Sequence, residues 1–266
     1  MPTKEVKTYK YQLSASKLNL FNEDPRVFWL VMHGHLKEPG RPFPSITGGI
    51  DRVMKEMCDQ YRGGLPPCLE GKMPGVLMHD QDLMKKWRHW KSGLQATVMV
   101  KDIEVRIIGA LDEVLIETPN IPWGSTETFS PLDHKSKGKE PMDDGAQYYQ
   151  AQSDIYGLLL DSNGYPISGK TYLHYCWPIE VKDWQVRDVP AIPMKFGSKV
   201  FALRSDPKEA IKLIELAVAC LERATPPPAS GNLSWFGEQY GAYTWGDHSK
   251  LNPVIRQEQE EGVSQR

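Results

Sequence analysis

Along the chain, apolar residues recur first at helical spacing and then, in the middle, at the period of two that strands show. The helical pattern predicts a short helix through Leu18 and Phe21, capped by Ser14 or Ser16, and further helices at 26–33, 50–61, 80–90, 145–160 and 206–223. β-rich segments predict strands at 96–100, 104–108, 111–117, 131–136, 171–177 and 199–203, the first two of which form a hairpin. We therefore expect an α/β fold, with a helical N-terminal lead and a central mixed β-sheet flanked by helices.

The two ends of the chain lack this patterning. Residues 1–12 are expected to form a flexible leader. Residues 246–266, which become rich in Gln and Glu, are expected to form a disordered tail. No shift in composition divides the rest, so residues 13–245 are expected to form a single domain.

Composition narrows the class of protein without selecting a function. The 266 residues are 40% hydrophobic and carry a net charge of −2, so a nucleic-acid partner would need a local basic patch. The four cysteines have no spacing that suits a metal site, which predicts reduced thiols in an intracellular, cytoplasmic protein. The sequence has no apolar leader and no run of about 18 apolar residues, so we expect a soluble protein without a membrane partner. P-loop and Rossmann glycine patterns are also absent, which argues against an ATPase.

Acidic and basic residues stand at predicted strand ends in the middle of the chain. Asp133 and Lys135 are separated by one residue of an extended segment, so their side chains point to the same face. Asp112, on the preceding strand, can come beside them. Two carboxylates can hold Mg²⁺ or Mn²⁺ with phosphate oxygens and water, and a neighbouring lysine can orient that water and stabilise developing charge. The set is therefore a candidate site for phosphodiester hydrolysis, although an Asp-x-Lys triplet is also typical of a surface ion pair.

His134 stands between the aspartate and the lysine of this triplet. Its backbone carbonyl is a further candidate metal ligand. Its side chain alternates to the opposite face of the strand, so we expect that side chain to be structural.

Four parts of the sequence, in this order, resemble motifs of the RecB-like branch of the PD-(D/E)xK nuclease superfamily, which includes the nucleases of CRISPR adaptation. The family's N-terminal helix pair is similar to residues 13–18 and 24–28, LSASKL and DPRVF. The strand with its first metal aspartate is similar to residues 109–114, GALDEV, and its DYKTG run to residues 133–138, DHKSKG. Its Q-x-x-x-Y helix motif is similar to residues 152–156, QSDIY. The order and spacing of these segments carry the resemblance.

The resemblance implies a restriction-endonuclease-like core and a metal-dependent DNA nuclease, either an exonuclease or a DNA-end-processing enzyme of recombination, repair or mobile elements. It implies Mg²⁺ or Mn²⁺ as cofactor, single-stranded DNA or duplex ends as substrate, and a helicase or recombinase as a class of partner. Asp112 and Asp133 would bind the metal, and Lys135 would be the catalytic lysine. Gln152 and Tyr156, one helical turn apart, would line the site and place the DNA strand; the alternative is a buried polar pair that braces the helix on the sheet.

The chain departs from the family at two points. Many relatives have a metal-binding His on the helix before the sheet, where this chain has Asp51. Asp51 can replace that His as a ligand of Mg²⁺ or Mn²⁺, or it can form an i,i+4 ion pair with Lys55. Several relatives also bind an iron–sulfur cluster through cysteines. Asp24 and residues 233–236 (LSWF) stand in those places, so we expect no iron–sulfur cluster.

Basic residues near the predicted site are candidates for contact with DNA. Lys137 and Lys139 follow the triplet, and Lys86 and Arg88 lie in the predicted helix at 80–90. The alternative for that helix is a solvated face whose tryptophans belong to the core. For the whole chain, the alternative function is a non-catalytic module of the same fold that binds DNA ends or a partner protein. Hydrolysis of RNA is a further alternative.

Overall fold

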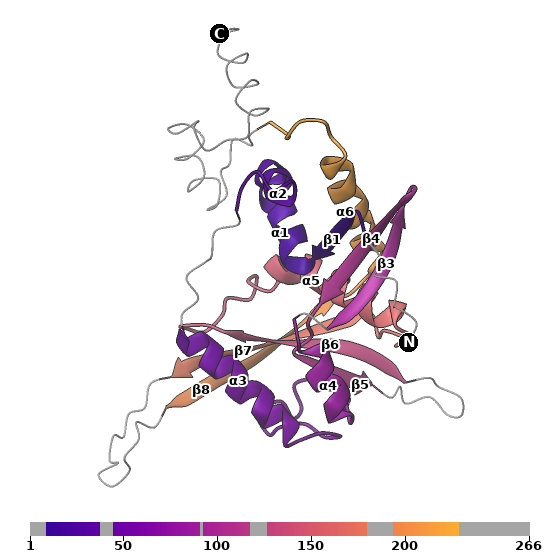
Figure 1. Cartoon of the computed structure of the whole chain (residues 1–266). Helices are drawn as coiled ribbons and strands as arrows, with labels where there is room; N and C mark the ends of the chain where they lie inside the picture. The colour runs from indigo at the N-terminus through magenta and orange to yellow at the C-terminus, as the bar shows by residue number, and fades with distance from the viewer. Residues whose placement is uncertain (1–8, 38–44, 91–92, 118–126, 180–193, 229–266) are drawn as a thin grey trace, which may run out of the picture. The chain divides into compact units, whose positions relative to one another are not determined.

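The computed structural model describes residues 9–37, 45–90, 93–117, 127–179 and 194–228 (Figure 1). The chain separates into two compact units. The single nuclease-like domain that the sequence predicts over 13–245 stays a prediction. The first unit consists of Met1–Ala15 and Phe43–Lys212, and the second of Ser16–Pro42 and Leu213–Arg266. Residues 1–8 of the expected leader and the whole expected tail at 246–266 lie outside the described residues.

The first unit is a mixed α/β structure, which confirms the expected class. Its strands are β1 (Tyr11–Ser14), β2 (Val76–Leu77), β3 (Leu94–Val100), β4 (Ile103–Gly109), β5 (Glu113–Glu117), β6 (Thr128–Ser136), β7 (Lys170–Ile179) and β8 (Lys195–Arg204). Its helices are α3 (Ser45–Asp59), α4 (Gln81–Trp87), the short 3₁₀ helix η1 (Gln147–Tyr149), α5 (Gln150–Ser162) and the first part of α6 (Pro207–Leu221). None of the helices within the described ranges is long and apolar enough to cross a bilayer.

The strands form two sheets, where the sequence predicted one central sheet. The smaller sheet has the order β1-β4-β3, and the larger one has the order β2-β5-β6-β7-β8. Tyr11 and Gln12, which were expected in a flexible leader, lie in β1 and pair in parallel with β4. The predicted hairpin of β3 and β4 forms, but it joins β1 instead of the larger sheet. An alternating pattern identifies a strand and its buried face, but it does not identify the strand's partner.

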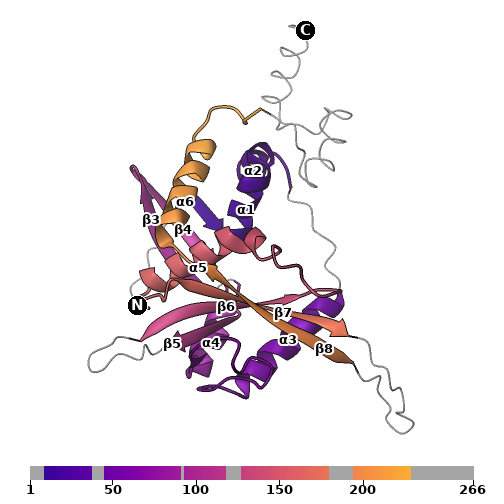
Figure 2. The same cartoon turned by 180° about the vertical axis from the view of Figure 1, so that it is seen from behind.

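Strand β6 lies in the middle of the larger sheet. It pairs antiparallel with β5 and parallel with β7. A parallel pair needs a long crossover connection, and η1 and α5 lie in that connection. Helices α3 and α5 contact β6 from opposite sides of the sheet (Figures 1 and 2). Because side chains alternate along a strand, Asp133 and Lys135 face α5, and His134 faces α3.

Apolar clusters cover both faces of the larger sheet. The cluster on the α3 face contains Cys58, Leu69, Met73, Leu77, Leu115, Leu132 and Tyr172. The cluster on the α5 face contains Ala146, Leu173, Tyr175 and Leu203. Burial on both faces removes most side chains of β6 from water, although several of them are polar or charged.

The second unit, over its described residues, contains α1 (Ala15–Glu23), α2 (Pro25–Met32) and the rest of α6. Asp24 is buried, and its carboxylate caps α2 by accepting a hydrogen bond from the Val27 amide (3.0 Å). The guanidinium of Arg26 donates to the Pro227 carbonyl (2.9 Å), which ties α2 to the segment after α6. Asp24 therefore acts as a helix cap.

Gly75 precedes β2 at a point where the chain passes very close to β5. Its φ is +75°, and a Cβ atom built on it would lie 2.2 Å from the Ile116 carbonyl oxygen. Gly71 has a similar φ of +69° but no atom within 4 Å of such a Cβ. Both substitutions by Ala should lose about 1–2 kcal/mol through the left-handed backbone. Gly75→Ala should lose a further ~1–3 kcal/mol through the clash, as measured by urea unfolding. Equal losses at the two glycines would contradict this close approach.

Candidate functional site

Asp133, Lys135 and Gln152 form a contact triangle between β6 and α5. The Lys135 ammonium lies 2.6 Å from Asp133 Oδ2. Gln152 Nε2 donates to Asp133 Oδ1 (2.7 Å), and Lys135 Nζ donates to Gln152 Oε1 (3.3 Å). The acid and the lysine predicted to share a face of the strand do so, and the amide of Gln152 bridges them.

The Asp133 carboxylate is buried, and this environment disfavours its charge. Burial raises the pKa of Asp133 to about 6, and the negative charge of Asp112 adds to the shift, while Lys135 and Gln152 offset part of it. The buried Oδ2 atom is held by the ion pair with Lys135, and no further hydrogen bond to it is present among the described residues. An ionised carboxylate oxygen has more than one lone pair, so Oδ2 can bind a further cation beside Lys135.

Asp112 stands immediately before β5 and beside the end of its pairing with β6. Its Oδ2 accepts a hydrogen bond from the His134 amide (3.0 Å), and its Oδ1 lies 2.7 Å from the Lys55 ammonium. Burial opposes ionisation of Asp112, but Lys55 and His134 outweigh it and hold its pKa below the usual range. The N–H and C=O of one strand residue point to the same edge, so the His134 carbonyl is directed to the Asp112 side of β6.

Asp51 and Lys55 lie one turn apart on α3, and their predicted ion pair is present. The Lys55 ammonium is 2.7 Å from Asp51 Oδ2 and also 2.7 Å from Asp112 Oδ1. Burial lowers the pKa of Lys55, but Asp112 and Asp51 outweigh it, so the pKa lies above its usual value. Asp51 can therefore form the ion pair with Lys55 and still lie near Asp112, the candidate metal ligand. The geometry is compatible with both alternatives for Asp51.

Two tyrosines complete the α5 side of the site. Tyr156 is buried beside Gln152, and burial together with the charges of Asp133 and Asp112 raises its pKa well above the usual value. The ring of Tyr149 lies 4.2 Å from Lys135 Nζ, in a cation–π contact that the sequence interpretation missed. Its position three residues before Gln152 is the signal that could have identified it.

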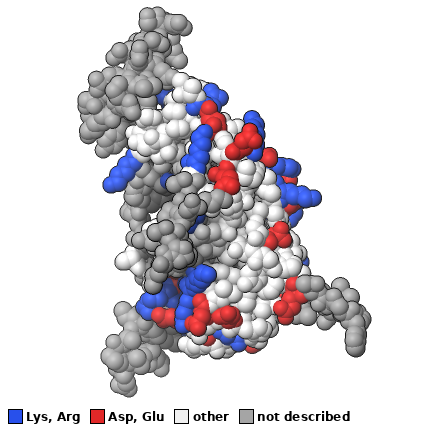
Figure 3. Space-filling model, turned by 45° about the vertical axis from the view of Figure 1, so that its right-hand side comes forward, with Lys and Arg blue, Asp and Glu red and all other residues white. Residues whose placement is uncertain are grey.

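Of the four basic residues that the sequence suggested for DNA contact, Arg88 is largely buried and already paired with acidic residues. It is 12% exposed, donates through Nε to the Asp112 carbonyl (2.8 Å) and pairs with Asp59 and Glu113. Lys86, Lys137 and Lys139 are exposed. Basic and acidic side chains are intermingled on the face shown in Figure 3, so no extended basic patch is seen among the described residues of that face. Contact of the three lysines with DNA stays a prediction.

Arg88 belongs to a buried ionic network that the sequence did not reveal. Glu113 is fully buried and accepts hydrogen bonds from Arg62 Nη1 (2.6 Å), Arg62 Nη2 (3.0 Å) and Arg88. Asp59 pairs with the same two arginines. Burial opposes the charge of Asp59, but Arg88 and Arg62 outweigh it and lower its pKa. This network joins α3, α4 and β5, and through Arg88 it holds the backbone at Asp112.

Cys58, Glu113 and His134 form a second group of potential ligands, with donor atoms within 4.8 Å of one another. Glu113 is already paired with two arginines. Both ring nitrogens of His134 also have partners, Cys58 Sγ at 3.6 Å and His174 Nδ1 at 3.1 Å. We therefore interpret this group as structural and do not treat it as a metal centre.

The His134 side chain belongs to a hydrogen-bonded chain on the α3 face, as its expected structural role requires. His174 Nε2 bonds to Ser198 Oγ (3.0 Å), which donates to the Cys68 carbonyl (3.1 Å). Burial lowers the pKa of His134 to about 4 and that of His174 to about 3, so both rings are neutral near pH 7. This series of hydrogen-bonded side chains connects β6, β7 and β8 on the face of the sheet opposite Asp133.

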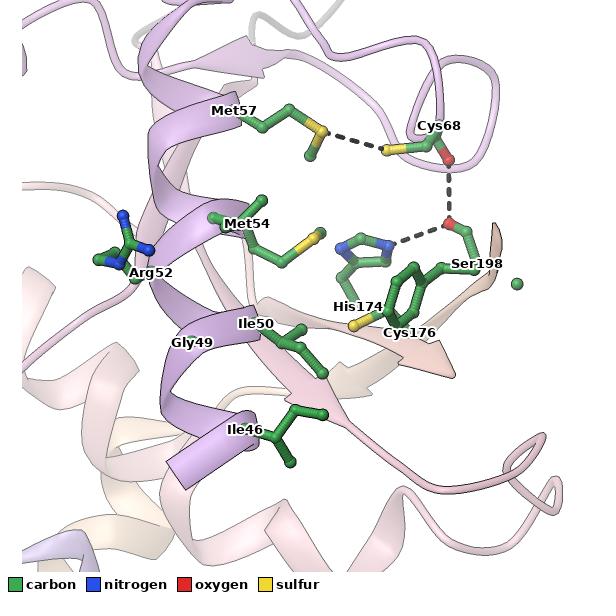
Figure 4. A pocket seen from close by; sticks show the side chains of 13 residues that line it. Ile46, Gly49, Ile50, Arg52, Met54, Met57, Cys68, His174, Cys176 and Ser198 are labelled. Carbon is green, nitrogen blue, oxygen red and sulfur yellow. Dashed lines mark hydrogen bonds between the residues drawn. The ribbon is translucent and has the colours of Figure 1, made fainter. Parts of the chain in front are cut away.

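A pocket of about 520 Å³ lies on the same α3 face (Figure 4). The apolar side of α3 forms one wall, including Ile50 and Met54, and His174 and Ser198 lie on the wall formed by β7 and β8. Because Asp133 and Lys135 face α5, this pocket is separated from them by the sheet. It does not contribute to the carboxylate site.

The charge of Glu113 should be essential for the stability of the first unit. Glu113→Gln keeps the shape but leaves Asp59 as the remaining acid of the network opposite the two largely buried arginines, so the free energy of unfolding should fall by about 3–5 kcal/mol. Glu56→Gln is the matched control, because Glu56 forms an exposed pair with Arg52, and its loss should stay below about 1 kcal/mol. Urea unfolding followed by tryptophan fluorescence measures both. Similar losses in the two variants would contradict the network's role.

Neutral His174 should make the protein sensitive to acid. Its folded pKa of about 3 lies below the unfolded value of 6.5, so the unfolded state binds more protons between these pH values. Stability should therefore fall as pH decreases from 6.5, with a contribution from this residue of about 1.4 kcal/mol per pH unit. His174→Gln should reduce the slope of unfolding free energy against pH between 6 and 4 by about this amount. The interpretation fails if the wild-type and variant slopes coincide.

Comparison with known proteins identifies no family for this chain. It matches no protein-family model, and no curated protein matches its sequence significantly. The interpretation of the site therefore depends on its own residues and their geometry.

Proposed function

We propose that this chain is a metal-dependent DNA nuclease, an exonuclease or DNA-end-processing enzyme on a restriction-endonuclease-like core. The observation that carries the proposal is the bridge made by Gln152. Its amide contacts both Asp133 and Lys135, although α5 follows β6 only after a long connection. Residues that the motif resemblance selected from separate segments, on β6 and on α5, thus contact one another, and this contact supports the proposal.

The donor set suits a hard divalent cation. Asp112, Asp133 and the His134 carbonyl would hold Mg²⁺ or Mn²⁺, with Asp51 as a further ligand, and all four supply oxygen atoms. The Oδ2 atom of Asp133 is buried, and beyond its ion pair with Lys135 it has no hydrogen bond among the described residues, which supports this fit. When bound, such a metal would polarise the phosphoryl group and lower the pKa of a bound water.

Lys135 is the residue that would act on the reacting groups. Its ammonium, held against Asp133, Gln152 and the ring of Tyr149, would orient the attacking water and stabilise the charge that develops on the phosphate. These three partners limit the freedom of a side chain that is otherwise flexible. Gln152 and Tyr156 would then position the lysine and the carboxylate, while Lys137, Lys139 and Lys86 would contact the DNA backbone.

The proposal is tested by nuclease assays with matched variants. The wild type should degrade linear single- or double-stranded DNA in Mg²⁺ or Mn²⁺. Asp133→Asn and Lys135→Met should each reduce the rate by about a hundredfold or more, because each removes a charge that acts on the reacting groups. Asp143→Asn and Lys199→Met are the controls, since Asp143 and Lys199 form an exposed acid–lysine pair (2.6 Å), and each should retain the wild-type rate.

Each other result has a defined meaning. Absence of cleavage by the wild type, or equal cleavage by all variants, contradicts the proposed function. DNA-end binding without cleavage would instead favour the non-catalytic binding module, and preferential cleavage of RNA would change the substrate. Closed circular DNA, included beside linear DNA, shows whether ends are required.

A further inference from the structure

The ammonium of Lys55 lies between two carboxylates that belong to the candidate metal site. It is 2.7 Å from Asp51 and 2.7 Å from Asp112, distances at which full charges interact strongly. A positive charge thus already contacts oxygen atoms that a divalent cation would need. An ordinary i,i+4 pair on α3 would involve Asp51 alone, so the contact with Asp112 requires a separate explanation.

The surrounding charges supply that explanation. Asp112 raises the pKa of Asp133, so these two carboxylates are close enough to repel each other when both are ionised. Lys135 compensates Asp133, and Lys55 compensates Asp112. Without a metal ion, the lysine on α3 therefore balances charge that would otherwise destabilise the folded site.

The Lys55 ammonium can also move away from the two carboxylates into solvent. Its side chain is 22% exposed, and that of Asp51 is 41% exposed, so the pair lies at the boundary with solvent. A lysine ammonium on a flexible four-carbon stem can move to water at a modest cost. Asp112, in contrast, is held by the His134 amide as well, and it would stay in place after the lysine has left.

We propose that Lys55 is an internal cation that occupies the Asp51–Asp112 carboxylate pair in the metal-free protein and that binding of Mg²⁺ or Mn²⁺ displaces it. This inference rests on the proposed function, because it concerns the same metal site. Lys55 is thus a residue that tunes the metal affinity: it preserves the geometry of the empty site and weakens metal binding by competition.

Calorimetric titration with Mn²⁺ tests the competition. Lys55→Met keeps most of the aliphatic stem and removes the charge, so Mn²⁺ should bind about tenfold tighter or more, the size of effect that a neighbouring charge has on a proton equilibrium. Lys199→Met, the same substitution at an exposed pair, should leave the affinity unchanged. In EDTA, Lys55→Met should melt at a lower temperature than the wild type, and saturating Mn²⁺ should reverse the difference.

A second measurement uses the wild type and does not depend on the folding of a variant. Acylation of lysine amines, followed by mass spectrometry, should modify Lys55 faster in saturating Mn²⁺ than in EDTA, because displacement moves its ammonium into water. Lys199 should react equally in both conditions.

The outcomes separate the two proposals. If the wild type binds Mn²⁺ but Lys55→Met binds it no more tightly, or if Mn²⁺ leaves the acylation of Lys55 unchanged, the displacement is wrong and the proposed function stands. If neither protein binds Mn²⁺, the metal site fails, and the displacement and the proposed function fail together.

Discussion

Burial of the Asp133 carboxylate on a central strand is the constraint on which the rest of the site depends. A carboxylate removed from water destabilises the fold unless its neighbours compensate the charge. On the α5 side, Lys135 and Gln152 provide that compensation through an ion pair and a hydrogen bond. Compensation remains incomplete, since the pKa of Asp133 is still raised to about 6. Under the proposed function, a bound divalent cation would compensate the remaining charge.

Further residues of alternating charge surround the Asp133 carboxylate. The charge of Asp112 acts on Asp133, the Lys55 ammonium contacts Asp112, and the guanidinium of Arg88 donates to the Asp112 backbone carbonyl. Arg88 is fixed in turn by the buried Glu113. Buried ion pairs contribute little net stability compared with apolar packing, but removal of one partner is costly. The network therefore acts mainly to keep the backbone at Asp112 in one position.

Because side chains alternate along β6, neighbouring residues of this strand have different roles on the two faces of the sheet. Asp133 and Lys135 point towards α5, while His134 points towards α3 and joins His174 in a chain of neutral hydrogen-bonded rings. The amide of His134, at the edge of the strand, binds Asp112. Of these three successive residues, Asp133 and Lys135 form the candidate site. His134 supports it through its ring on the opposite face and through its amide, which binds Asp112.

Much of this arrangement could be predicted from the sequence, because it depends on local periodicity. The period of two placed Asp133 and Lys135 on one face and His134 on the other, and the helical period placed Gln152 and Tyr156 one turn apart. Most helices and strands were predicted for the same reason, including the hairpin of β3 and β4.

Other features were decided by the tertiary structure, because they join residues that no period relates. The pairing of β1 with β4, the inward position of Arg88 and the contact of Lys55 with Asp112 all depend on which elements pack together. The sequence by itself determined which groups are present on each face. Only long-range packing decided which charges meet, because the energy of a buried charge depends on its neighbours in space.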